Sequence, residues 1–160
     1  MANWCFNTVR FRGEAEQVKK VTLLFLNLQV RQIIDEKGQL PDFVNGDSGH
    51  LFDLHMENGV LDFCTKWTPN VDIIAQVADY FQLDFTQDYS ETANGIYGQF
   101  VYEGGTLRDI CLEIEDFARY SYDEEKERYL FEGDYYEDDS EILQILLERR
   151  RLQNLGNGNQ

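Results

Sequence analysis

Alternating and helical patterns of apolar residues divide the first half of the chain into strands and helices. Residues 4–12 place apolar side chains at both odd and even positions, which predicts a central strand with apolar groups on both faces. In 14–28, apolar residues recur three and four positions apart behind an acidic first turn, as is typical of an amphipathic helix. The following stretch, 35–50, is rich in Gly and Asp and is predicted to be a long loop.

The middle of the chain shows the strongest local signal. Asn58-Gly59 separates two alternating runs, 51–57 and 60–67, and this pair favours the positive φ angles of a tight turn, so we predict a β-hairpin. A helix over 69–81 follows, with Pro69 at its first position, and then a strand over 83–89.

The order strand, helix, strand, strand, helix, strand is the split βαβ pattern of the ferredoxin-like fold. Right-handed crossovers would place both helices on one face of an antiparallel sheet, with the first and third strands in the middle. We therefore predict an α+β protein with a βαββαβ core.

The last third adds two hairpins and a helix. Gly104-Gly105 joins two alternating runs that would extend the sheet beside the fourth strand. The tyrosine-rich stretch 119–141 predicts an acidic hairpin, after which Ser140 is expected to cap a C-terminal helix. We expect Ile145 and Leu146 to pack this helix onto a single domain of residues 1–153, followed by a flexible tail of 154–160.

Three stretches carry a resemblance to a known family: MANWCFNTVRFRG, TKWTPN and NGIYGQ, together with the acidic hairpin and helix after them. They resemble the YubB family of small plasmid- and phage-borne proteins. The resemblance implies a ferredoxin-like domain and a mobile genetic element as the setting. It implies no activity and no catalytic residue.

Charge narrows the classes of partner. The chain carries 30 acidic and 14 basic residues, a net charge of −16, and residues 103–148 alone hold 16 acidic and 4 basic ones. Phosphate binding uses clustered Lys and Arg, so direct nucleic-acid binding is not expected.

Three isolated cysteines predict reduced thiols in the cytoplasm. No signal peptide or apolar run of membrane-spanning length is present, so we expect no membrane association.

The acidic stretch is the first candidate site. It is interpreted either as a surface for a basic protein, which could imitate the phosphate charge of nucleic acid and so occupy a DNA- or RNA-binding host protein, or as charge that only keeps the protein soluble. Its candidate residues are Glu124, Glu125, Glu127, Glu132, Asp134, Glu137, Asp138 and Asp139.

The second candidate is the sheet face that the helices leave open. RNA-recognition domains stack bases on aromatic residues of such a face, and a small ligand could bind there too. The chain lacks their sequence signature and has few basic residues nearby, so we expect the C-terminal helix to cover the face. The candidate aromatic residues are Trp4, Phe6, Phe63 and Trp67.

No motif indicates catalysis. G-x-S-x-G, Walker A and GxGxxG sequences are absent, and no His, Cys or acidic spacing matches a known metal motif. The carboxylates at 137–141 are better explained as helix caps than as cation ligands. We therefore predict no enzyme activity, no cofactor and no metal, and interpret the protein as a non-catalytic protein-interaction module with an unknown partner.

Overall fold

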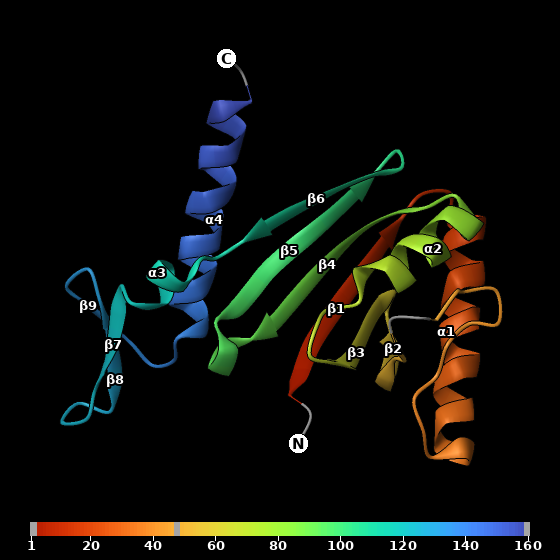
Figure 1. Cartoon of the computed structure of the whole chain (residues 1–160), viewed down its shortest axis with the longest axis horizontal. Coiled ribbons are helices and arrows are strands. Elements are labelled where there is room, and N and C mark those ends of the chain that lie inside the picture. The colour runs from red at the N-terminus through yellow and green to blue at the C-terminus, as the bar shows by residue number, and fades with distance from the viewer. Residues whose placement is uncertain (1–2, 47–48, 159–160) are drawn as a thin grey trace. The chain divides into compact units, whose positions relative to one another are not determined.

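The computed structural model describes residues 3–46 and 49–158, which divide into two compact units (Figure 1). The first unit comprises the chain up to Glu91 together with Gln99–Asp109, and the second comprises Thr92–Gly98 together with the chain from Ile110 onward. A single domain over 1–153 was predicted from the sequence, and that stays a prediction. The apolar residues of the last third pack on one another and form a core of their own.

A six-stranded sheet has the strand order β2-β3-β1-β4-β5-β6. β1 lies in its interior and pairs antiparallel with β3 on one side and with β4 on the other. This confirms the predicted α+β class and the antiparallel sheet. The strands are β1 (Trp4–Arg12), β2 (Phe52–Glu57), β3 (Val60–Lys66), β4 (Asp84–Glu91), β5 (Ile96–Glu103) and β6 (Thr106–Cys111).

Two helices, α1 (Ala15–Asp35) and α2 (Val71–Phe81), pack on one face of this sheet (Figure 1). Both contribute to the core that β1 and β4 line, since alternate strand residues point toward the helices. α1 continues seven residues beyond the predicted end at Leu28. The fully buried side chains of this core include those of Phe25, Ile73, Ile74, Leu61 and Phe85.

A polar network lies in the centre of this otherwise apolar layer. Asn7 is buried and donates hydrogen bonds from Nδ2 to the carbonyl oxygen of Cys5 and to Thr65 Oγ1, both at 3.0 Å. Gln87 Nε2 donates to Asn7 Oδ1 at 2.9 Å and to the carbonyl oxygen of Pro69 at 3.0 Å. The network therefore joins three neighbouring strands to the turn that precedes α2.

The second unit has a three-stranded sheet of order β7-β8-β9 and a long C-terminal helix, which confirms the predicted helix. Its core surrounds Phe131 and includes Leu112, Ile142, Leu143 and Leu146. Neither α3 nor β9 was predicted. The elements are α3 (Ile114–Phe117), β7 (Tyr120–Asp123), β8 (Arg128–Phe131), β9 (Asp134–Tyr136) and α4 (Ser140–Asn157).

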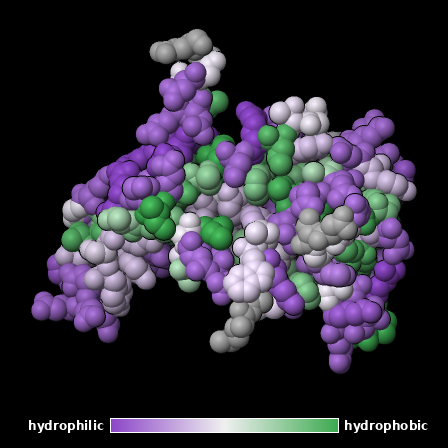
Figure 2. All heavy atoms as spheres, viewed as in Figure 1, coloured by the Kyte–Doolittle hydropathy of each residue, from purple (hydrophilic) through white to green (hydrophobic). Residues whose placement is uncertain are grey.

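Helix α4 also differs from prediction at its end and in its packing. Residues 154–157 are helical rather than a tail, and the predicted tail residues 159–160 lie outside the described residues. Leu146 is buried in the core of the second unit, and Ile145 packs against its edge. The apolar face of α4 is thus occupied within its own unit. Hydrophilic residues cover most of the side of the molecule seen in Figure 2.

Candidate binding face

The sheet of the first unit has one face that α1 and α2 do not cover. Strand alternation directs Cys5, Val9 and Phe11 to the helices, so the even-numbered residues of β1, from Trp4 to Arg12, lie on the opposite, open face. Phe6 on this face is 60% exposed. Helix α4, which was expected to cover this face, packs its apolar residues Ile142, Leu143 and Leu146 around Phe131 within the second unit.

One end of the open face carries an aromatic cluster, which we define as Trp4, Phe6, Phe52 and Lys66. The rings of Trp4 and Phe52 meet edge to face at 5.1 Å between centroids. Lys66 Nζ lies 4.9 Å from the Phe52 centroid and 5.8 Å from that of Trp4, within range of a cation–π attraction. Phe6 and Phe52 are both Cα partners of Cys64, which places them on the same face of the sheet, one on each side of β3.

Two of the four predicted aromatic residues do not join this cluster. Phe63 is 2% exposed and belongs to the helix-covered core, because its Cα partner on β1 is the buried Asn7 rather than Phe6. Trp67 follows β3 with a φ of 71°, and its backbone N–H donates a hydrogen bond to the carbonyl oxygen of Asn3 at 2.9 Å. Trp67 is exposed, yet it lies beyond the strand, so only Trp4 and Phe6 meet the expectation.

Phe52 was missed because a β-bulge interrupts the alternation of β2. The register shifts between Phe52 and His55, and Asp53 has a φ of 52°. Phe52 and Leu54 are two positions apart in sequence, which predicts the same face. The bulge instead leaves Phe52 beside Trp4 while Leu54 enters the core.

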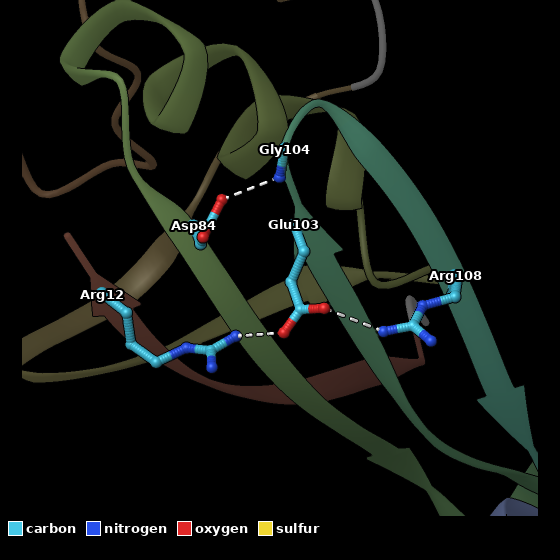
Figure 3. Close-up of polar contacts among 5 residues, drawn as sticks. All are labelled: Arg12, Asp84, Glu103, Gly104 and Arg108. Atoms are coloured by element: carbon cyan, nitrogen blue, oxygen red, sulfur yellow. Dashed lines mark hydrogen bonds and ion pairs between the residues drawn. The ribbon is translucent and has the colours of Figure 1, made fainter.

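Away from the aromatic cluster, the arginines of the open face form ion pairs. Glu103 accepts hydrogen bonds from Arg12 at 3.2 Å and from Arg108 at 3.0 Å, so its carboxylate bridges two guanidinium groups (Figure 3). Arg10 Nη1 donates to Asp88 Oδ2 at 3.1 Å. Each of these three arginines faces a carboxylate of its own sheet. They do not form the unpaired cationic surface that phosphate groups require.

The thiols near this face are poorly suited to nucleophilic chemistry. Burial, followed by the nearby Asp53 charge, raises the pKa of Cys64 above its ordinary value. Burial also raises the pKa of Cys5, to about 11. Because the thiolate is the reactive form, the raised pKa values leave little of either thiol in its reactive form at neutral pH.

The predicted acidic surface is divided among several roles. Glu132 accepts hydrogen bonds from Arg149 at 2.6 and 2.8 Å and from Arg119 at 2.8 Å, and the bonds from Arg149 hold the pKa of its carboxyl below the ordinary value. Asp138 accepts the Ser140 hydroxyl and the Ser140 backbone N–H, which lowers its pKa in the same way. Asp138 thus accepts a backbone N–H of the first turn of α4, whereas the N-cap residue is Asp139, whose side chain makes no capping hydrogen bond, and Ser140 is the first helical residue.

Of the other predicted acids, two lie beside a polar partner and four are exposed. Asp139 accepts the Tyr120 hydroxyl at 3.2 Å, and Glu137 lies 3.8 Å from Arg128. Asp134 is exposed at the start of β9. The exposed turn between β7 and β8 holds the remaining three, Glu124, Glu125 and Glu127, which we call the hairpin tip.

The acidity is shared equally by the two units. The first carries 16 acidic and 8 basic residues and the second 14 and 6, so each has a net charge of −8. The second unit is shorter and has the higher charge density. A negative surface is therefore a property of the whole chain and does not single out the hairpin tip.

These features define a ferredoxin-like domain with an open sheet face. Residues 49–132 match the family described as "Ferredoxin-like domain in Api92-like protein", which is more than half of the chain, so the chain belongs to this family. The match supports the fold implied by the YubB resemblance, while the YubB name and the plasmid or phage setting stay predictions. No curated protein and no solved structure matches the chain.

Two searches for other kinds of site were negative. Within residues 3–46 and 49–158, no group of three or more His, Cys, Asp or Glu side chains is arranged to hold a metal ion. None of the described helices combines the length and the apolar composition needed to cross a bilayer.

Proposed function

We propose that this chain is a non-catalytic protein-interaction module and that its contact with a partner is the aromatic cluster on the open face. The observation that carries the proposal is Phe6, a large apolar side chain 60% exposed beside the Trp4–Phe52 pair. Exposed apolar groups gathered in this way are typical of binding surfaces. The element order and the β2-β3-β1-β4 strand order support a split βαβ core, which leaves this face free.

The chemistry of the cluster favours one kind of partner. Phe6 and Trp4 offer apolar surface, and Lys66 stands over two rings rather than against a carboxylate. A protein segment with an exposed apolar side chain would cover Phe6 and pack beside Lys66. The protonated state of the two buried thiols supports the non-catalytic part of the proposal.

RNA is the less favourable occupant of the same face. Stacking on Trp4 and Phe6 would be available to bases, but the backbone phosphates would meet the acidic partners of Arg10 and Arg12 and a unit of net charge −8. A cytoplasmic protein partner, in the plasmid or phage setting that the YubB resemblance implies, fits these charges better.

The test compares binding by matched variants. Phe6→Ser and Lys66→Glu remove the apolar and cationic parts of the cluster, and Tyr80→Ser is the control, because Tyr80 is equally exposed on α2. Proteins that co-purify with the parent chain should be lost with both cluster variants and retained with Tyr80→Ser, with unchanged circular dichroism. Retention by both cluster variants would refute the proposal. Binding of oligouridylate that Phe6→Ser abolishes would assign the face to RNA instead.

A second candidate function rests on the hairpin tip. Glu124, Glu125 and Glu127 form no ion pair with the basic residues that the structure describes, and they project from a four-residue strand pair. We propose that a basic protein, such as a nucleic-acid-binding one, could bind them in place of phosphates. The triple Gln variant should fold normally and lose such a partner at low salt, whereas Glu14→Gln with Glu16→Gln should not. A triple variant that keeps every partner would leave the charge a solubilising role only.

A further inference from the structure

Helix α1 has two apolar faces rather than one. Val21, Phe25 and Leu28 pack into the core of the first unit. Five further aliphatic residues are between 38% and 75% exposed, and we call them the outer stripe: Leu23, Leu26, Val30, Ile33 and Ile34. Hydrophobic residues are visible at the surface on the α1 side of the molecule in Figure 2.

The outer stripe is continuous and points away from the sheet. At about 100° per residue, its members cluster within one sector of the helix, and that sector lies opposite the core-facing residues Val21 and Leu28. From Leu23 to Ile34 the stripe extends roughly 17 Å along the axis. A stripe of this kind is unusual on the surface of a soluble monomer.

The spacing of the stripe is that of a helix-pairing seam. Leu23, Leu26, Val30 and Ile33 are separated by three, four and three residues, which is the alternation of the a and d positions in a coiled coil. Such a seam fits another helix with the same spacing. The pairs 23 with 33 and 26 with 30 share one midpoint, so the seam is complementary to itself when a second copy runs antiparallel.

The charge of α1 is compatible with self-association at this surface. The chain carries −16, so two copies repel each other, and each unit carries −8. Helix α1, like α4, departs from this average, because its Lys19, Lys20 and Arg31 outnumber Glu16 and Asp35 and give it a net charge of +1. Two copies that meet through α1 avoid the repulsion that opposes contact elsewhere on an acidic surface.

We propose that α1 mediates an isologous dimer in which the outer stripes of two copies pack antiparallel. Leu23 would face Ile33 of the partner subunit, and Leu26 would face Val30 of the partner subunit, about a two-fold axis near position 28. A two-fold contact of one surface with itself is the commonest form of protein oligomer. The proposal does not rest on the aromatic cluster, although Ile33 of the stripe and Phe52 of the cluster line one cavity.

The size of the stripe sets the expected strength. Five aliphatic side chains that each lose about 100 Å² contribute roughly 500 Å² per copy. A standard stable interface buries about 800 Å² per partner. The dimer should therefore be reversible and dependent on concentration. Added salt should strengthen it, since salt screens the repulsion between the two acidic chains and leaves an apolar contact intact.

Sedimentation velocity of the full chain over a range of concentrations tests the contact. The parent should show a monomer–dimer equilibrium, and Ile33→Asp should raise the dissociation constant at least tenfold. Leu155→Asp is the matched control, because Leu155 is a 58% exposed aliphatic residue of α4. A parent that stays monomeric at every concentration, or a dimer that Ile33→Asp leaves unchanged, would overturn the proposal.

Disulfide trapping tests the antiparallel register in a Cys111→Ser background, which removes the exposed native thiol. A mixture of Leu23→Cys and Ile33→Cys chains should form the mixed cross-linked dimer under mild oxidation. Cross-linking of Leu23→Cys chains to each other would instead indicate a parallel pair and would refute the arrangement proposed.

Discussion

Truncation of Leu146 to Ala should destabilise the second unit selectively. Leu146 is 1% exposed and packs in a core with Phe131, Ile142, Leu143 and Leu147, all of which belong to the second unit. Removal of the side chain leaves a cavity that only this core can fill. The lost stability should therefore appear in one unit and not in the other.

The size of the effect follows from burial. A fully buried Leu changed to Ala costs about 2–5 kcal/mol, from lost transfer free energy and from the cavity. The second unit has about 60 residues, and at ~0.05–0.15 kcal/mol per residue its stability is about 3–9 kcal/mol. The substitution should remove about half of that stability. Leu152→Ala on the same helix should cost under ~0.5 kcal/mol, because Leu152 is exposed.

The two units can be followed separately in one urea titration. Both tryptophans, Trp4 and Trp67, belong to the first unit, so tryptophan fluorescence reports on that unit. Amide hydrogen exchange in α4 reports on the second. Leu146→Ala should accelerate exchange throughout α4 while the fluorescence midpoint stays in place. Equal shifts of both signals would show that the chain unfolds as one cooperative domain, which would refute the reasoning.

Three further outcomes follow from individual side chains. Asn7→Ala removes the acceptor of the Gln87 amide in the buried network and should cost about 1–3 kcal/mol in the fluorescence transition of the first unit. A smaller cost than for Thr8→Ala, at a half-buried position of the same strand, would contradict this. The pKa of the Glu132 carboxyl is lowered in the folded protein, so its ion pairs with Arg149 and Arg119 stabilise the fold at neutral pH. That stabilisation is lost as the pH falls below 4.5, the ordinary pKa of a Glu carboxyl. Glu132→Gln should therefore lower the melting temperature at neutral pH and have no effect in strong acid; a pH-independent difference would argue against the ion pairs. Iodoacetamide should modify Cys111 rapidly in the native protein and the other two thiols only after unfolding, and fast labelling of all three would be inconsistent with their burial.

Local patterns predicted the strands and helices of the first unit well, because each pattern reflects the surroundings of a single element. The alternation in residues 4–12 corresponds to β1, and the helical spacing after it corresponds to α1. The end of α1 was harder to place. Val30, Ile33 and Ile34 are apolar but exposed, so they do not continue the core-facing stripe on which the prediction of 14–28 relied.

Long-range partners could not be predicted in the same way. Phe131 and Leu146 are apolar and are therefore expected to be buried. A local sequence pattern does not determine whether they pack against the large sheet or, as the structure shows, against each other. The open face depends on register as well. Phe63 was expected beside Phe6, but it pairs with Asn7 and is therefore buried on the helix-covered face. The bulge at Asp53 places Phe52 on the open face instead. A shift of one residue reverses the face of every side chain in a strand.

Net charge, the most conspicuous feature of the sequence, proves the least informative guide to a binding surface, because both units carry −8. Because the net charge is the same in both units, candidate binding surfaces are better identified where negative and positive charges balance locally. The open face pairs its arginines with carboxylates and exposes an aromatic cluster beside them. Helix α1 carries +1 and exposes an aliphatic stripe. Apolar contacts form most readily where like charges do not oppose them, so these two surfaces, rather than the most acidic one, are where the protein should meet its partners.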